Sequence, residues 1–238
     1  EKNKVTRENI MVIMAGGFGT RLRPHTDNCP KPMLLVHKKP ILEHIVVNAK
    51  KEGFQEFVFC IHYLGHMVEE YFGKGEQWGV NINYIKENSP LGTSGALSLL
   101  SKRPDKPFIV TNGDVLTNID FDELLRFHES KNSEATMCTR EYEHIIPYGV
   151  IETQADTITG LSEKPRMKFN INTGVYVLSP NLLKRIPKNE YYDLPVLFSE
   201  LIENNIQPYH YHVTDYWIDI GRKDEYAKAN RDFESDLL

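Results

Sequence analysis

The sequence predicts an α/β protein with a mixed, mainly parallel sheet flanked by helices in a Rossmann-like arrangement. Three short apolar runs, 10–15, 57–61 and 108–110, have the character of buried strands. Segments with helical spacing of apolar residues separate them. Alternation of strand and helix patterns is typical of a mainly parallel sheet.

The helices of the first half carry recognisable end signals. We predict a helix over 41–49, with Pro40 in its first turn and Gly53 as its C-terminal cap. A short amphipathic helix over 67–72, a half-buried strand over 80–85 and a helix over 95–100 follow. Either Asp120 or Asp122 is predicted to cap a helix that runs through Phe127.

From about residue 135 strand patterns dominate, over 135–139, 149–152, 157–161, 174–178 and 209–213. Helices are predicted over 182–186, 196–202 and 224–233. We divide the chain into a linker or tail over 1–9 and a single domain over 10–238. Within the domain we expect a first half over about 10–134, a second half over about 135–215, and a closing segment over about 216–238 that returns to the binding site.

Composition narrows the classes of function. The 238 residues carry a formal net charge of -5, which argues against binding of bulk nucleic acid or of an anionic membrane. No apolar run reaches the roughly 18–20 residues of a membrane span, and no signal peptide is visible. The three cysteines show no metal-ligand spacing and fit reduced thiols, so we expect a cytoplasmic protein.

A glycine loop follows the first predicted strand and is the first candidate site. Gly16, Gly17 and Gly19 can expose backbone N–H groups to a phosphate, and the cations Arg21 and Lys31 follow. The loop matches neither the Walker A pattern nor the full dinucleotide fingerprint. An ordinary strand-to-helix turn is the alternative, although Pro30 and Pro32 on either side of Lys31 favour a fixed charge.

A second candidate lies where the 108–110 strand ends, in the sequence Asn112-Gly113-Asp114. Open α/β sheets bind ligands at the carboxyl ends of their strands, although Asp114 could equally belong to a turn. A DxD glycosyltransferase motif would need a second aspartate at position 116. Leu116 occupies that position, which argues against a glycosyltransferase with this motif.

Six short motifs, AGGFGTRLRP, PKPM, YGV, EKP, NTG and WIDIG, occur in this order between residues 10 and 233. Together they resemble the signature of sugar-1-phosphate nucleotidyltransferases. The resemblance implies a GT-A-like fold with a nucleotide-binding half, a smaller sugar-binding lobe over about 135–215, and transfer of a nucleotidyl group by in-line attack on the α-phosphorus. The short 36–40 loop is less glycine-rich than in that family.

The resemblance also implies roles for individual residues. The reacting centre would contain Arg21, Lys31, Asp114 and Asp219, and the two aspartates would bind Mg²⁺. The nucleotide would contact Ala15, Gly16, Gly17, Gly19, Thr20, Arg21, Glu87, Leu91, Gly92, Thr93, Asn112 and Gly113. The sugar phosphate would contact Gly149, Glu163, Lys164, Asn172, Thr173 and Gly174.

The substrate pair follows less directly. PKPM, 192–195 and the 216–222 ending are most similar to the bacterial guanylyltransferase-like branch. Some members lie behind a CBS-domain pair in legionaminic acid pathways, and the polar start of this sequence predicts a fusion of that kind. We expect GTP with a hexose or amino-hexose 1-phosphate. UTP or dTTP with glucose 1-phosphate is the alternative, a non-catalytic regulatory subunit is another, and a homo-oligomer stays open.

Overall fold

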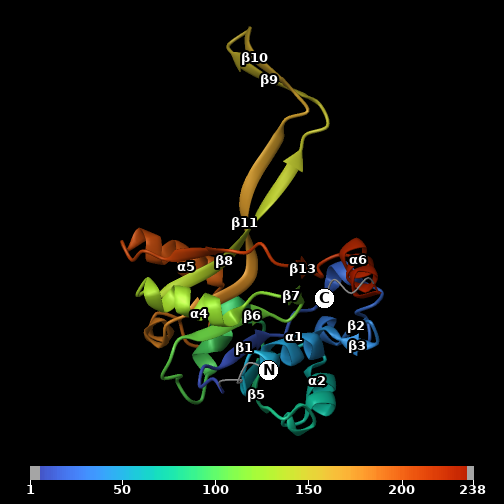
Figure 1. The fold of residues 1–238 in the computed structure, drawn as a ribbon, viewed down its shortest axis with the longest axis vertical. Coiled ribbons are helices and arrows are strands. Elements are labelled where there is room, and N and C mark those ends of the chain that lie inside the picture. The colour runs from blue at the N-terminus through green and yellow to red at the C-terminus, as the bar shows by residue number, and fades with distance from the viewer. Residues whose placement is uncertain (1–5, 235–238) are drawn as a thin grey trace.

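The computed structural model describes residues 6–234, and its centre is a seven-stranded sheet in the order β12-β8-β11-β6-β1-β4-β5 (Figure 1). Its parallel part consists of β1 (Met11–Met14), β4 (Glu56–Ile61), β5 (Asn81–Lys86) and β6 (Phe108–Asn112). β8 (Ala135–Ile145), β11 (Arg166–Leu178) and β12 (Tyr209–His212) extend the sheet, and β11 runs antiparallel to both neighbours. The predicted mixed, mainly parallel sheet is confirmed.

Helices cover both faces of this sheet. One face packs against α1 (Ile41–Lys51), α2 (Gly65–Phe72) and α4 (Phe121–Ser130). The other packs against α3 (Gly92–Gly95), the 3-10 helix Ala96–Leu99 and α5 (Leu194–Glu203). In β1, Met11 and Ile13 enter the first core and Val12 enters the second. A strand buried on both faces needs a continuous apolar run, which is the pattern of 10–15.

The helix ends follow the local signals closely. Asp120 caps α4, since its Oδ1 accepts the N–H of Glu123 at 2.9 Å. Gly53 follows α1 with a φ of 96°. The helix predicted over 182–186 is instead the 3-10 helix Pro180–Lys184. Ile186 precedes a proline, and the α conformation is sterically disfavoured for a residue in that position.

The shorter elements connect the two ends of the chain. β2 (Leu35–Val36) and β3 (Lys39–Pro40) form a small hairpin, and the 3-10 helices Thr20–Leu22, Lys31–Met33 and Glu76–Trp78 lie in loops. β7 (Val115–Thr117) pairs with β13 (Trp217–Asp219), and α6 (Lys223–Glu234) follows. α6 packs back onto β2, where the Tyr226 hydroxyl donates to the carbonyl of Leu35 at 2.6 Å.

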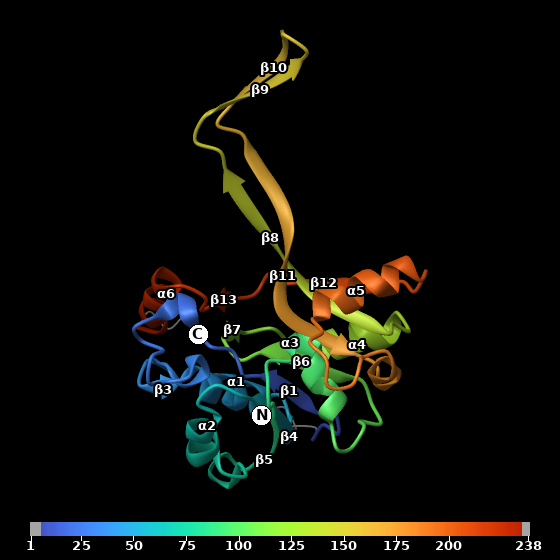
Figure 2. The same ribbon diagram turned by 180° about the vertical axis from the view of Figure 1, so that it is seen from behind.

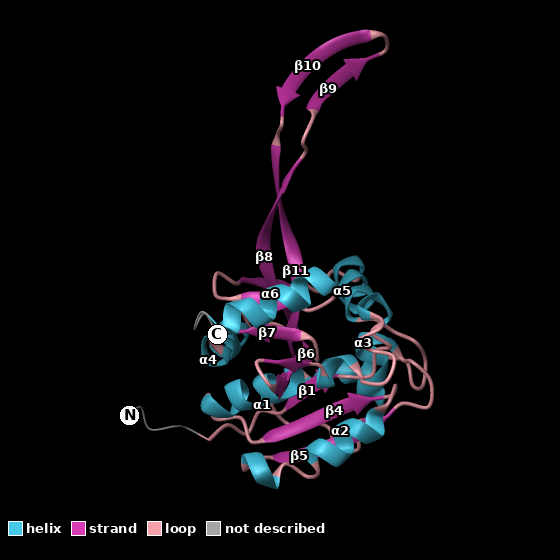
Figure 3. Cartoon of the chain, turned by 90° about the vertical axis from the view of Figure 1, so that its right-hand side faces the viewer, coloured by secondary structure: helices cyan, strands magenta, loops and turns pink. Residues whose placement is uncertain are grey.

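The second half of the chain takes two forms. The inner parts of β8 and β11 belong to the central sheet, whereas their outer parts project away from it together with β9 (Gly149–Gln154) and β10 (Thr157–Glu163) (Figures 2 and 3). We call residues 140–171 the arm. The sequence predicts a smaller lobe here, and the structure extends these strands as a two-stranded ribbon.

Two further predictions concern the surroundings of the domain. Among residues 6–234 no helix has the length and apolar character needed to cross a membrane. Part of the predicted 1–9 tail, residues 1–5, lies outside the described residues. In the remainder, the Arg7 N–H donates to the carbonyl of Gly53 at 3.0 Å, so this part contacts the domain.

Candidate active site

The carboxyl ends of β1 and β6 lie side by side, since Met14 pairs with Asn112. The glycine loop leaves β1 at this edge, and Gly113 and Asp114 leave β6 beside it. A cavity of about 320 Å³ opens there. It is lined by Met14, Ala15, Gly16, Gly17, Phe18, Lys31, Pro32, Glu87, Pro90, Gly92, Thr93, Asn112, Gly113, Asp114, Tyr191 and Asp193.

The glycine loop turns tightly around the residues that hold Lys31. Gly19 adopts a φ of 62°, and a Cβ atom there would lie 2.9 Å from Thr26 Cγ2 and 3.2 Å from Lys31 Cβ. The Thr26 hydroxyl donates to the carbonyl of Gly19 at 2.8 Å. Only glycine fits this position, so the loop stays close to Lys31.

Lys31 reaches two carboxylates that are far apart in sequence. Its ammonium group pairs with Asp114 and lies 3.9 Å from Asp219 Oδ1. The two aspartates meet because β13 pairs with β7, and the N–H of Ile220 donates to the carbonyl of Asp114 at 3.0 Å. Lys31 itself is 8% exposed, so its charge acts in a partly desolvated site.

The electrostatics of this cluster are visible at Asp219. Burial and the neighbouring charge of Asp114 raise the pKa of Asp219 to about 6, while Lys31 and Arg21 act in the opposite direction. Burial is the larger of the two effects, so ionised Asp219 is costly here unless a positive charge lies beside it. A site of this kind attracts a further cation.

The same two carboxylates fit a bound Mg²⁺. Asp114 Oδ1 and Asp219 Oδ1 are buried and have no hydrogen-bond donor. Mg²⁺ prefers such oxygens and usually takes one or two carboxylates, with phosphate oxygens and water completing its shell. No group of three or more potential metal-ligating side chains occurs in residues 6–234.

The opposite wall of the cavity is formed by the loop before α3. Glu87 Oε2 accepts the N–H of Leu91 at 2.9 Å, and burial raises the pKa of Glu87. Asp193 accepts the N–H and hydroxyl of Thr93 at 2.8 and 3.1 Å. Gly92 adopts a φ of 75°, and a Cβ atom there would lie 2.7 Å from Asp193. These contacts give the wall a defined shape.

The structure brings together most of the predicted nucleotide-binding residues. Ala15, Gly16, Gly17, Glu87, Gly92, Thr93, Asn112 and Gly113 line the cavity. Gly19, Thr20 and Leu91 support it from the adjoining turns rather than line it. Arg21 is exposed beside Gly221, where a Cβ atom would lie 3.3 Å from its guanidinium group.

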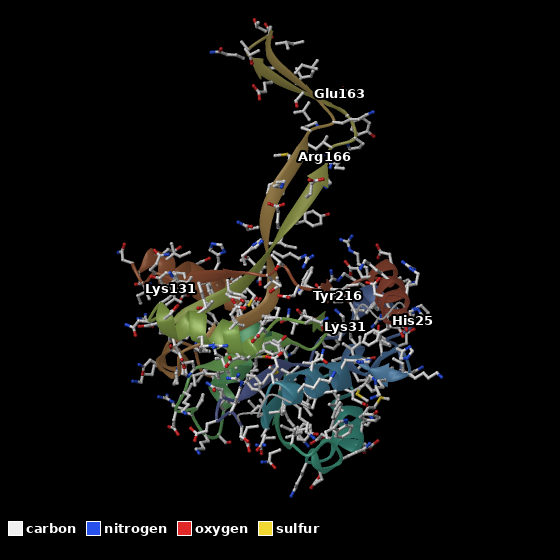
Figure 4. All side chains as sticks on the ribbon, in the orientation of Figure 1. His25, Lys31, Lys131, Glu163, Arg166 and Tyr216 are labelled. Carbon is white, nitrogen blue, oxygen red and sulfur yellow. The ribbon has the colours of Figure 1, made fainter. Side chains whose placement is uncertain are left out.

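The predicted sugar-phosphate residues divide into two groups. Asn172, Thr173 and Gly174 lie at the root of the arm, where the Trp217 indole donates to the carbonyl of Thr173 at 2.8 Å. The Thr173 hydroxyl is already used in a 2.9 Å bond to the carbonyl of Cys138. Gly149, Glu163 and Lys164 lie on the outer arm, away from Lys31, as Figure 4 shows for Glu163. The structure does not bring this second group to the cavity.

Six residues that line the cavity were not assigned to the site from the sequence: Met14, Phe18, Pro32, Pro90, Tyr191 and Asp193. Phe18 stands at the rim, 44% exposed, and packs edge-on against His62. Tyr191 and Asp193 come from the loop before α5, and the Tyr191 hydroxyl donates to Asp193 Oδ2 at 2.7 Å. Asp193 lies directly before a Leu-Pro helix start, which indicates a cap, and the similarity of 192–195 to the guanylyltransferase-like branch did not by itself assign it to the site.

Comparisons with known proteins agree with this geometry. A family model described as "Nucleotidyl transferase" matches residues 10–236. A UTP–glucose-1-phosphate uridylyltransferase from Synechocystis is 32% identical over 92% of this chain and 62% of its own length. The catalytic subunit beta of a mannose-1-phosphate guanylyltransferase from Danio rerio is 34% identical over 90% of this chain and 62% of its own length. The chain thus spans less than two thirds of these relatives.

Solved structures show the same fold. HddC from Yersinia pseudotuberculosis aligns with a TM-score of 0.74 and 27% identity over 94% of this chain and 99% of that one. A structure of HddC complexed with GMP-PN aligns with a TM-score of 0.73 and 26% identity, covering 94% and 99% of the two chains. On the family match and the shared fold, this chain belongs to the nucleotidyl transferase family.

Proposed function

We propose that this chain joins a nucleoside triphosphate to a sugar 1-phosphate, giving a nucleotide sugar and pyrophosphate. The observation that carries the proposal is the buried Lys31 between Asp114 and Asp219, at the mouth of a cavity of about 320 Å³. The cavity provides a wall for a base and a glycine loop for phosphates. The charged cluster lies where the α-phosphate would then be.

The chain's own residues act by positioning and by charge. The attacking oxygen of the sugar phosphate is already an anion, so the reaction needs no strong base, and its difficulty is the approach of two anions. Lys31 and Arg21 stabilise the negative charge that develops on the phosphate oxygens. Asp114 and Asp219 would hold Mg²⁺, which when bound supplies further charge neutralisation at the phosphates.

The remaining sugar-phosphate contacts are assigned by resemblance. We assign Glu163 to the hydroxyl groups of the sugar and Lys164 to its phosphate, with Gly149 beside the hexose. We assign residues 10–134 to the nucleotide, 135–215 to the sugar phosphate and 216–238 to the return to the site. The opposite charges of Glu163 and Lys164 suit a ligand that carries both hydroxyl groups and a phosphate.

For the base we favour guanine, with a hexose or amino-hexose 1-phosphate as the second substrate. The guanylyltransferase relatives and the GMP-PN complex of HddC support this choice. The Synechocystis relative supports the alternative, uracil with glucose 1-phosphate. A fusion to CBS-type domains in a legionaminic acid pathway extends the same proposal.

The test is a pyrophosphate-release screen of the four ribonucleoside triphosphates and dTTP against a panel of sugar 1-phosphates with Mg²⁺. We expect release with GTP and one hexose or amino-hexose 1-phosphate. Release only with UTP or dTTP would replace guanine in the proposal. Release with no pair would favour a regulatory subunit of the same fold, although Arg21, Lys31, Asp114 and Asp219 are all present.

A further inference from the structure

The inner ribbon of the arm has one mainly charged face, which also carries Ile145 opposite Arg166 at 47% exposed, and one mainly apolar face. Side chains of directly opposed residues point to the same face of a two-stranded ribbon. Phe169 is opposite Tyr142, and they are 47% and 50% exposed, with Met167 beside them at 44%. The reverse face carries the ion pairs Arg166–Glu143 and Lys168–Glu141, at 2.9 and 2.8 Å.

The outer hairpin repeats this asymmetry. Ile151 is opposite Leu161, and Gly149 is opposite Glu163 on the same face. Ile151 and Leu161 are 43% and 69% exposed, and Ile158 near the tip is 65% exposed. An isolated two-stranded ribbon buries no core and is at best marginally stable in water. Two successive apolar faces on such a ribbon therefore need another surface.

The arm's own domain does not provide that surface. β8 and β11 pair without interruption inside the arm, from Arg140–Ile171 to Ile145–Arg166, and their register shifts between Asn172 and Tyr176 at its root. At its root the Thr173 hydroxyl donates to the carbonyl of Cys138, and the Trp217 indole donates to the carbonyl of Thr173. Folding the arm back over its own cavity would require these two bonds at the root to rearrange, and with them in place the arm points outward (Figure 3).

The cavity, for its part, receives only Tyr191 and Asp193 from the second half of the chain. No residue of 115–190 lines it. Under the proposed function, one substrate has its pocket, and the residues assigned to the other are held on the outer arm, Glu163 in β10 (Figure 4) and Lys164 directly after it, where its N–H donates to the carbonyl of Tyr148. Within one copy, the cavity therefore lacks the residues assigned to the sugar phosphate, and the arm lacks a surface that covers its apolar side chains.

We propose that two copies of this chain exchange arms, so that each outer hairpin covers the cavity of the other copy and supplies Glu163 and Lys164 to it. This inference rests on the proposed function. In a two-fold dimer the same patch meets itself, so the Tyr142–Phe169 faces of the two inner ribbons pack together. From Arg140 to Gln154 an extended strand spans roughly 45 Å at about 3.3 Å per residue, about the width of a domain of this size.

The dimer is tested first without any substrate, by sedimentation velocity on matched double variants. Tyr142→Ser with Phe169→Ser changes one opposed pair on the apolar face. Glu141→Ser with Asn170→Ser changes the next opposed pair on the charged face. We expect a dimer for the wild type and the charged-face variant, and a shift to monomer for the apolar-face variant. A monomeric wild type, or an apolar-face variant that stays dimeric, would overturn the exchange.

The sharing of the site is tested by combining two impaired chains, assayed at a sugar 1-phosphate concentration far below the wild-type KM, where the raised KM of Lys164→Ala lowers the rate. Lys31→Ala and Lys164→Ala chains with different affinity tags are co-expressed, and the heterodimer is purified. Exchange places both substitutions in one site and leaves the other intact, so we expect about half of the wild-type pyrophosphate release. A heterodimer as impaired as its two parents, beside an active wild-type heterodimer with the same tags, would overturn it. Wild type without release would reject the proposed function instead, and sedimentation would still decide the exchange.

Discussion

The cavity and the arm each carry half of one predicted site, and they differ in how firmly the fold of one chain holds these residues. At the cavity, Lys31, Asp114 and Asp219 are fixed by buried strands and by contacts within one chain. On the arm, Glu163 and Lys164 lie on a ribbon whose large apolar side chains are exposed. The difference shows that motifs of one site can depend on different levels of structure. The cavity residues are brought together by the folding of one chain, whereas the arm residues lie on a ribbon that needs a further surface to pack against.

The largest effect on turnover is expected for substitutions at the cavity. Lys31→Ala and Asp114→Asn should each lower kcat by at least about a hundredfold, because one preorganised charge contact at a reacting phosphate is typically worth about 2.7–4 kcal/mol. Steady-state pyrophosphate release, with circular dichroism to check the fold, measures this. Near-normal turnover by either folded variant would reject the assigned roles.

A smaller and more selective effect is expected on the arm side. Lys164→Ala should raise the KM for the sugar 1-phosphate at least about tenfold and leave the KM for the nucleotide unchanged, because one charge-assisted bond is worth about 1.5–3 kcal/mol. Lys168→Ala is the matched control, since Lys168 lies on the same arm and pairs with Glu141 at 2.8 Å. Equal effects of the two substitutions would mean that the arm acts only through its general charge.

The cavity wall provides a stability test. Asp193→Ala removes the acceptor of two bonds from Thr93, and we expect a loss of about 1.5–3 kcal/mol in the free energy of unfolding with a raised KM for the nucleotide. Burial raises the pKa of Asp193, but the hydrogen bonds from Thr93 and Tyr191 outweigh burial, and the net pKa is lowered. The folded state is therefore more stable when Asp193 is ionised. Urea titration measures the loss. An unchanged unfolding midpoint would show that Asp193 does not hold the wall.

The smallest expected effect is a pH-dependent gain at Asp219. Its pKa is raised from 3.8 to about 6, so its stabilising contribution is present below pH 4 and is lost as the pH rises through 6. Asp219→Asn should therefore raise the free energy of unfolding at pH 7.5 without Mg²⁺ by about 1 kcal/mol, allowing for a side chain that is 41% exposed.

The matching measurement is urea unfolding of wild type and Asp219→Asn at pH 4 and at pH 7.5. No difference is expected at pH 4, and turnover should be lost at both values. Added Mg²⁺ should stabilise the wild type more than the variant, since the variant lacks one carboxylate. A variant that is less stable than wild type at pH 7.5 would contradict the raised pKa.

Much of the fold was predictable because its signals are local. The apolar runs of β1, β4 and β6 reflect burial on both faces, and the cap of α4 depends on Asp120 and Glu123 alone. The glycine loop and the proline-flanked Lys31 were likewise visible in consecutive residues. Local spacing is sufficient where neighbouring residues create the conformation.

Only the tertiary structure decided which distant residues meet. Asp219 reaches Asp114 through the pairing of β13 with β7, and Asp193 reaches Thr93 through the loop before α5. The contact of Asp193 with Thr93 has no local sequence signal, and Asp219 was placed beside Asp114 only through the resemblance of its motif. Strand pairing between distant segments depends on the packing of the whole chain. The same holds for the arm. Its alternating side chains predict strands, but the long pairing of β8 with β11 and the separate β9–β10 hairpin decide that Glu163 lies away from the cavity of its own chain.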